Sequence, residues 1–175
     1  MEDFSGVHFG ETNRLPEKYF IEIGRVVVTW AYFEQNFDIW IHCLWEKSYP
    51  RKSKPGLIIP FRKRRKLWLE LILKITKEKD TINEARDVSS SAGHIRSLRD
   101  HVSHGVWLPI LKPGSFEHES YRLLSIKSKA PPEGDVLPRT LDDLKLLSNQ
   151  ITKLNARTED LLKKIFPGGY GVRYP

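Results

Sequence analysis

Apolar and aromatic side chains recur every three or four residues after Pro16, and this pattern constrains the fold more than any other feature. Pro16 suits the first turn of a helix, and the pattern continues to about Lys47. Such a helix is about 45 Å long. We expect its wide apolar side to form an interface between two copies of the chain as well as a core. The residues on this side are Phe20, Ile23, Val27, Trp30, Phe33, Phe37, Trp40, Ile41 and Leu44.

Three further helices are predicted downstream. Ser48 to Pro60 contains three prolines and Gly56, so it is predicted to be a loop, and the second helix follows at about residues 61–79. Thr81 to Glu84 has the form of a capping box that opens a third helix. That helix is expected to run to about His104, where Gly105 stops it.

Thr140 to Asp143 is predicted to open the last helix, which has an apolar side of its own. Before it, two β-prone runs at 106–111 and 121–127 predict a small hairpin, and residues 130–138 are a proline-rich connector. The sequence thus predicts one all-α domain at 16–167 with four main helices and a hairpin insert at about 106–127. Residues 1–15 are expected to form a flexible leader, and 168–175 a flexible tail. The apolar side of the last helix consists of Leu144, Leu147, Ile151, Leu154, Leu161 and Ile165.

Cysteine usage and hydropathy predict a cytoplasmic protein. Cys43 is the single cysteine, which excludes an internal disulfide and fits a reducing compartment. Residues 1–12 are polar and acidic, unlike a signal peptide. The most apolar long stretch, Val26 to Trp45, contains Glu34 and Asp38, whose burial in a bilayer would cost several kcal/mol. We therefore expect no membrane partner.

The net charge of +7 is concentrated in one stretch. Residues 47–69 contain nine basic residues and no acidic one. A local field of this kind attracts polyanions, nucleic acid above all. A solvated loop and helix start is the alternative interpretation. The part of this stretch predicted to bind RNA is Arg62, Lys63, Arg64, Arg65 and Lys66.

One arginine of the third helix lies in an apolar stripe. Val88, Ala92, Ile95, Arg99, Val102 and Val106 follow a 4-3-4-3-4 spacing and so share one face. An unpaired guanidinium at such a position would be costly to bury. Arg99 is therefore expected to face a carboxylate, an anionic ligand or a polar cleft. The purely structural alternative pairs it with Glu34 or Asp38 of the first helix.

The segment Arg99-Asp100-His101-Val102-Ser103-His104 resembles the HEPN (higher eukaryotes and prokaryotes nucleotide-binding) family. The signature of that family is an arginine and a histidine separated by four to six residues, the first of which is usually polar. Arg99, Asp100 and His104 fill these positions, although Arg96 and His101 satisfy the same spacing. The resemblance implies a four-to-five-helix up-and-down bundle and metal-independent cleavage of RNA, without a cofactor.

The implied chemistry suits these residue types. A histidine such as His104 exchanges protons near neutral pH, and an arginine such as Arg99 stabilises charge on a phosphate. Attack by the ribose 2′-hydroxyl would leave a 2′,3′-cyclic phosphate. Asp100 is expected to orient the imidazole or to hold Arg99. Further RNA contacts are predicted for Arg96, His101 and Trp107.

Helix geometry favours a site made by two chains. Arg99 and His104 are five residues apart, so they point about 140° apart on a regular helix. Members of the resembling family typically pair two such helices across a dimer. We therefore expect a homodimeric endoribonuclease of the toxin–antitoxin or antiviral kind, with RNA as substrate and an antitoxin or regulatory protein as a further partner.

Other functions stay open at this point. A non-catalytic module that binds nucleic acid or nucleotide through the basic stretch is one, and a structural or regulatory dimer is another. His94, His101 and His104 lie within about 80° on one helix, where a metal site is conceivable but less expected than solvent-facing histidines. The tryptophans at helical spacing are expected in the core rather than stacked on bases, namely Trp30, Trp40, Trp45 and Trp68.

Overall fold

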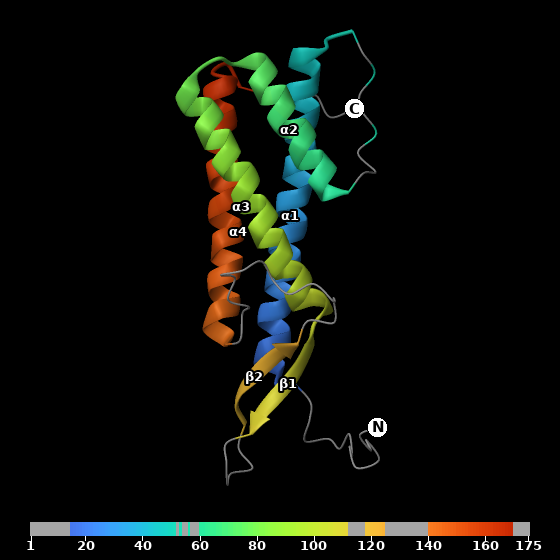
Figure 1. Ribbon diagram of the computed structural model, residues 1–175, viewed down its shortest axis with the longest axis vertical. Coiled ribbons are helices and arrows are strands. Elements are labelled where there is room, and N and C mark those ends of the chain that lie inside the picture. The colour runs from blue at the N-terminus through green and yellow to red at the C-terminus, as the bar shows by residue number, and fades with distance from the viewer. Residues whose placement is uncertain are drawn as a thin grey trace, which may run out of the picture.

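The protein is a helical bundle with a small two-stranded sheet at one end (Figure 1). A computed structural model describes residues 15–51, 53, 56, 60–111, 118–124 and 140–169. The predicted leader, apart from residue 15, and the tail from residue 170 onward lie outside these residues. The predicted all-α class is confirmed. The helices are α1 (Glu17–Ser48), α2 (Phe61–Ile75), α3 (Lys79–His104) and α4 (Leu141–Ile165).

The direction of α2 departs from the simple up-and-down order. Phe61 contacts Phe33, Trp68 contacts Phe37, and Lys74 lies over the ring of Tyr49, so α2 runs parallel to α1. Only α3 runs opposite to the other three helices (Figure 1). The physical reason is the length of the linker. Residues 49–60 can reach up to about 40 Å, whereas α2 is only about 22 Å long, so the chain can return before α2 begins.

The predicted start of α4 and the predicted capping box at α3 have different outcomes. At α4 the prediction is confirmed, because Thr140 Oγ1 accepts from the Asp143 backbone N–H and Asp143 accepts from that of Thr140. At α3 it is wrong. The helix begins earlier, at Lys79, and Thr81 is buried inside it, where its hydroxyl donates to Glu78.

The side chain of Glu84 explains the failure at α3. It accepts a hydrogen bond from Lys164 of α4 at 2.7 Å instead of turning back to cap its own helix. The second helix is also shorter than predicted and ends at Ile75, after which Thr76 is extended. The bond between Glu84 and Lys164 thus takes the place of the predicted cap, and a break after Ile75 separates α2 from α3.

Aromatic residues of α1 and α2 form the centre of the core. Trp30, Trp40 and Trp68 are buried as predicted, whereas Trp45 is half-buried against Tyr49. Rings approach with centroids 5.1–6.3 Å apart, and such pairs contribute about 0.5–1.5 kcal/mol each beyond the area they bury. Much of the wide aromatic side of α1 is therefore covered by α2 of the same chain rather than by a second copy.

The first half of α1 nevertheless keeps an exposed apolar surface, which we call the α1 stripe. Phe20 is 60% and Tyr32 65% exposed, and a Cβ placed on Gly24 would meet no atom within 4 Å. The spacing of its members repeats every seven residues, so they lie along one side of the helix. The α1 stripe consists of Phe20, Ile21, Gly24, Val27, Val28, Ala31 and Tyr32.

The strands β1 (Val106–Leu111) and β2 (His118–Leu124) follow α3 and pair antiparallel. Residues 125–127, which the sequence places in the second strand, lie outside the described residues. α3 ends at the predicted glycine, but Gly105 is extended (φ −80°, ψ 159°) and leads directly into β1. Trp107 packs its ring 5.8 Å from that of Tyr19 and donates to the Val102 carbonyl. These contacts fix the start of β1 against α1 and α3.

Candidate functional site

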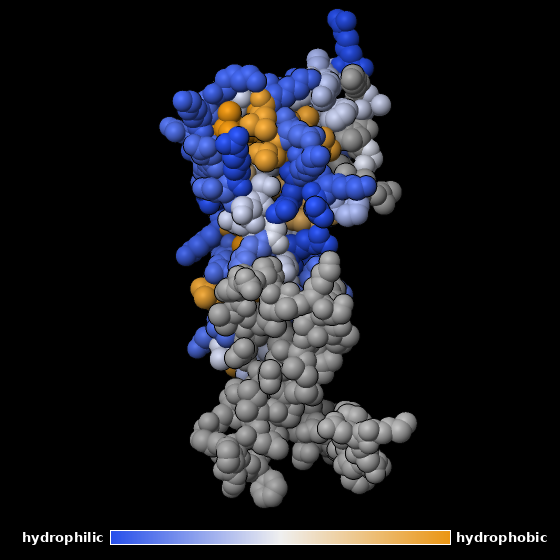
Figure 2. Space-filling view, in the orientation of Figure 1, coloured by the Kyte–Doolittle hydropathy of each residue, from blue (hydrophilic) through white to orange (hydrophobic). Residues whose placement is uncertain are grey.

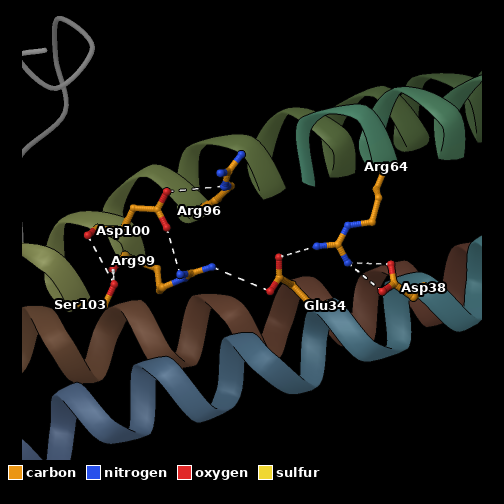
Figure 3. Close-up of polar contacts among 7 residues, drawn as sticks. All are labelled: Glu34, Asp38, Arg64, Arg96, Arg99, Asp100 and Ser103. Carbon is orange, nitrogen blue, oxygen red and sulfur yellow. Dashed lines mark hydrogen bonds and ion pairs between the residues drawn. The ribbon is translucent and has the colours of Figure 1, made fainter. Parts of the chain in front are cut away.

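A chain of alternating charges connects α1, α2 and α3 (Figure 3). It begins at Asp38 of α1, passes through Arg64 of α2 and Glu34 of α1, and continues to Arg99 of α3. Three carboxylates alternate with three guanidinium groups, so the formal charges balance. We call these residues the ion-pair network: Asp38, Arg64, Glu34, Arg99, Asp100 and Arg96.

Arg99 lies at the α3 end of this network, with only 17% of its side chain exposed. Its Nη1 is 3.0 Å from Asp100 Oδ1, and its Nη2 is 3.9 Å from Glu34 Oε2. The guanidinium carbon lies 5.3 Å from the centre of the Trp30 ring. The carboxylate partner expected for an arginine in an apolar stripe is therefore present. Two carboxylates face Arg99, those of Asp100 and Glu34, and Glu34 is one of the two partners named in the purely structural alternative.

Asp100 connects Arg99 to a second arginine. Its Oδ2 lies 3.6 Å from Nε of Arg96, one turn earlier on α3, while its Oδ1 faces Arg99 (Figure 3). Of the two roles expected for Asp100, this geometry fits the holding of Arg99. Ser103 donates its hydroxyl to the Arg99 carbonyl and so stays bound to its own helix.

The two histidines of the motif have opposite surroundings. His104, in the last helical turn, is exposed. His101 is buried, and its Nδ1 lies 2.6 Å from the Ser97 carbonyl oxygen, while its Nε2 has no partner within the described part of the chain. A solvent-facing histidine was expected at both positions, and His101 departs from this because its ring packs inward. α3 remains helical through His104, so Arg99 and His104 stay on different sides of it.

The basic run of α2 divides into outward and inward side chains. Arg62, Lys63 and Lys66 are exposed. Arg64 turns inward and donates to both oxygens of Asp38 at 2.8 Å and to Glu34 at 3.0 Å. Arg65 also turns inward, where Nη1 donates to the Ser89 carbonyl of α3. The five side chains therefore do not form one surface.

Arg65 lies against α3 because Gly93 leaves room for it. A Cβ on Gly93 would collide with the Arg65 guanidinium. Burial lowers the pKa of Arg65, and the positive charges of Arg96 and Arg62 lower it further. Three guanidinium groups thus gather beside the Arg99 end of the network, and sequence spacing alone gave no sign of this grouping.

Neither metal ligands nor membrane spans are evident in the part of the chain that the structure describes. Within it, no group of three or more histidine, cysteine or acidic side chains is placed to hold a metal ion. None of the described helices is long and apolar enough to cross a bilayer.

Comparisons with protein-family models, with curated proteins and with solved structures found no match to this chain. The HEPN resemblance therefore stays a prediction based on its six-residue motif and on helix order. The sequence had named Arg99, Asp100 and Glu34 as interacting candidates. It had not predicted that Arg64 shares Glu34 with Arg99, which depends on the parallel packing of α2 on α1, nor that Trp30 lies under Arg99, which depends on the packing of α3 on α1.

Proposed function

We propose that this protein is a homodimeric, metal-independent endoribonuclease with a HEPN-like bundle, in which Arg99 and His104 act on the RNA phosphate. The observation that carries the proposal is how Arg99 is held by its neighbours. It is half-buried on Trp30 and held by Asp100, but its contact with Glu34 is long, at 3.9 Å. An arriving phosphate can replace such a contact at small cost, because its charge-assisted bonds to a guanidinium fork are stronger.

The reaction would proceed by internal transesterification. His104 takes the proton of the ribose 2′-hydroxyl, the 2′-oxygen attacks phosphorus, and the 5′-oxygen leaves with a proton from a second general acid. Arg99 stabilises the charge that grows on the non-bridging oxygens. The products are a 2′,3′-cyclic phosphate end and a 5′-hydroxyl end.

A second protomer supplies the missing half of the site in this proposal. His104 and Arg99 of one chain point apart on α3, so a partner's copy of the motif is needed to bring both groups to one phosphate. The α1 stripe lies at the same height along α1 as Trp30, which packs under Arg99, but on a different face, because residues two apart such as Val28 and Trp30 point about 160° apart. An exposed apolar stripe of this kind is typical of a two-fold helix interface.

The decisive experiment incubates the purified protein with RNA in excess EDTA. Wild type should leave 2′,3′-cyclic phosphate ends, and His104→Ala should lower the rate about 10²- to 10⁴-fold. Arg86→Ala is the matched control, because Arg86 is exposed on the same helix and lies outside the ion-pair network. Absence of cleavage by wild type, or equal rates for wild type and His104→Ala, would refute the proposal.

The dimer is tested in the same preparation. Val28→Glu places a charge in the α1 stripe and should convert the dimer to a monomer in light scattering, with loss of cleavage. A monomeric wild type that cleaves RNA would contradict the two-chain site.

The exposed cations of α2 favour a second candidate, a non-catalytic nucleic-acid-binding module. Arg62, Lys63 and Lys66 face solvent and are available to phosphates. Salt-dependent RNA binding that persists in His104→Ala without any cleavage by wild type would support this candidate. With neither binding nor cleavage, and a lower melting temperature for Arg99→Ala, the structural or regulatory dimer is the remaining function. An antitoxin or regulatory protein as partner belongs to the first candidate only.

A further inference from the structure

A groove of about 550 Å³ lies between α3 and α4. It is separate from the ion-pair network, to which α4 contributes no residue, and His94 and Arg99 point about 140° apart on α3. The two helices run antiparallel, and α3 moves away from α4 toward the end that leads into β1 (Figure 1). A volume of this size fits a ligand as large as a mononucleotide. The polar residues that line the groove are Ser90, Ser91, His94, Gln150, Lys153 and Arg157.

The charge of the groove has one sign. Lys153 and Arg157 are cations, His94 becomes one on protonation, and no carboxylate is among the described lining residues. Arg157 is paired to an acid, Asp87, whose Oδ2 lies 3.5 Å from Arg157 Nη2, and the two side chains are 71% and 42% exposed for Asp87 and Arg157. A pair of that kind contributes little and is readily exchanged for a stronger anion.

Several donors of the groove are not used within the fold. Ser90, Ser91 and Lys153 make no hydrogen bond or ion pair in the part of the chain that the structure describes. Ser103 and Thr158, by contrast, donate their hydroxyls to the carbonyl four residues earlier. Two hydroxyls and one ammonium group are therefore free to serve a ligand.

The floor of the groove is apolar. It is formed by Ile95 of α3 and Leu154 of α4, both of which are otherwise packed in the core. A ligand that suits this combination has an anionic end for the cations and hydroxyls and a flat or apolar body for the floor. The coloured atoms in Figure 2 are mostly hydrophilic, with apolar atoms showing between them.

We propose that the α3–α4 groove binds a phosphate ester of mononucleotide size, with the phosphate on Lys153 and Arg157 and the ring on Ile95 and Leu154. The serine hydroxyls complete the phosphate site as donors. This site is distinct from the RNA-cleaving site, and its ligand is bound without being transformed. The proposal does not rest on cleavage, because binding is measured directly.

The test titrates the full chain, labelled with ¹⁵N, with AMP as the probe. Amide signals of Ser90, Ser91 and Gln150 should shift more than those of residues around Arg99. Adenosine, which lacks the phosphate, should bind at least about tenfold more weakly. Shifts that cluster around Arg99, no shifts at low-millimolar AMP, or equal affinity for adenosine would each overturn the proposal.

A pair of double variants separates a specific site from general attraction by charge. Lys153→Gln/Arg157→Gln should weaken AMP binding about tenfold or more, because two charge-assisted contacts are lost. Lys145→Gln/Lys163→Gln removes the same charge from α4 outside the groove and should change the affinity by less than about twofold. Equal weakening by both would show non-specific attraction and refute the site.

A further variant covers the case in which the first double variant does not fold. Ser91→Leu keeps every cation but fills the groove, and it should also abolish the AMP-induced shifts. Unchanged AMP binding by folded Ser91→Leu would contradict the proposed location.

Discussion

Arg64 and Arg99 lie on either side of Glu34 in the same ion-pair network and have nearly the same surroundings. Each packs on an aromatic ring at 5.3 Å, Phe61 for Arg64 and Trp30 for Arg99, and each has a buried Nε without a partner among the described residues. They differ in how firmly their carboxylates hold them. Arg64 of α2 makes three hydrogen bonds of 2.8–3.0 Å to the carboxylates of Asp38 and Glu34 on α1. Arg99 has one contact of 3.0 Å, to Asp100, the next residue of its own helix.

This difference separates a structural arginine from an available one. Arg64 joins α2 to α1, and its loss would leave Glu34 and Asp38 uncompensated. Arg99 is oriented by Trp30 and Asp100, but its contact across helices is long enough to be replaced. The available arginine is the one that shares the six-residue motif with His104. The comparison predicts that variants of Arg64 chiefly affect stability and those of Arg99 chiefly affect catalysis.

The largest effect is expected for Arg99→Ala in RNA cleavage. The rate should fall about 10²- to 10³-fold, the usual loss when one donor to the developing charge is removed. The unfolding free energy should fall by only about 1 kcal/mol, since its ion pairs are long or local. Single-turnover cleavage and urea denaturation measure the two effects. A melting temperature that drops steeply while cleavage persists would reverse the assignment.

The next effect is the stability loss of Arg64→Ala. We expect about 3 kcal/mol, at the low end for breaking a buried pair, because Glu34 and Asp38 are partly exposed. Urea denaturation measures it, and the double variant with Glu34→Gln should recover part of the loss. If the coupling energy between Arg64 and Glu34 is no larger than that between Arg99 and Glu34, the two arginines do not differ in how firmly they are held.

The smallest effect is expected for Gly93→Ala, which tests the cations beside the network. The new Cβ displaces the flexible end of Arg65, so its bond to Ser89 is lost while the helix gains about 1 kcal/mol of propensity. Because the pKa of Arg65 is lowered in the fold, its charged form gains from moving into water. The net change in unfolding free energy should stay within about 1 kcal/mol.

Gly24→Ala, made in the monomeric Val28→Glu background so that the α1 stripe is not in an interface, is the control for that substitution, since no atom lies near its Cβ and it measures helix propensity alone. The freed Arg65 should also steepen the salt dependence of RNA binding by about one unit in slope. A large destabilisation by Gly93→Ala would mean that Arg65 cannot move and is part of the packing.

Helical periodicity carried most of the fold prediction. The buried positions of α4, the buried tryptophans of α1 and α2, and the start of α4 at Thr140 followed from spacing and local sequence. The capping box at Thr81 failed because Glu84 finds a partner on α4. The end of α2 was placed too late because Thr76 becomes extended, which no periodic pattern revealed.

For the candidate site, the sequence by itself determined that Arg99 occupies an apolar stripe and needs a partner, since a buried guanidinium cannot remain uncompensated. It also fixed the angle between Arg99 and His104, because both are on one regular helix. Only the tertiary structure decided which acid each arginine holds. The linker lets α2 return and pack parallel to α1, which brings Arg64 within 3.0 Å of Glu34. Arg99 lies 3.9 Å from the same carboxylate and is therefore held less firmly than Arg64. Contacts between helices depend on chain direction and packing, and these are properties that no single segment encodes.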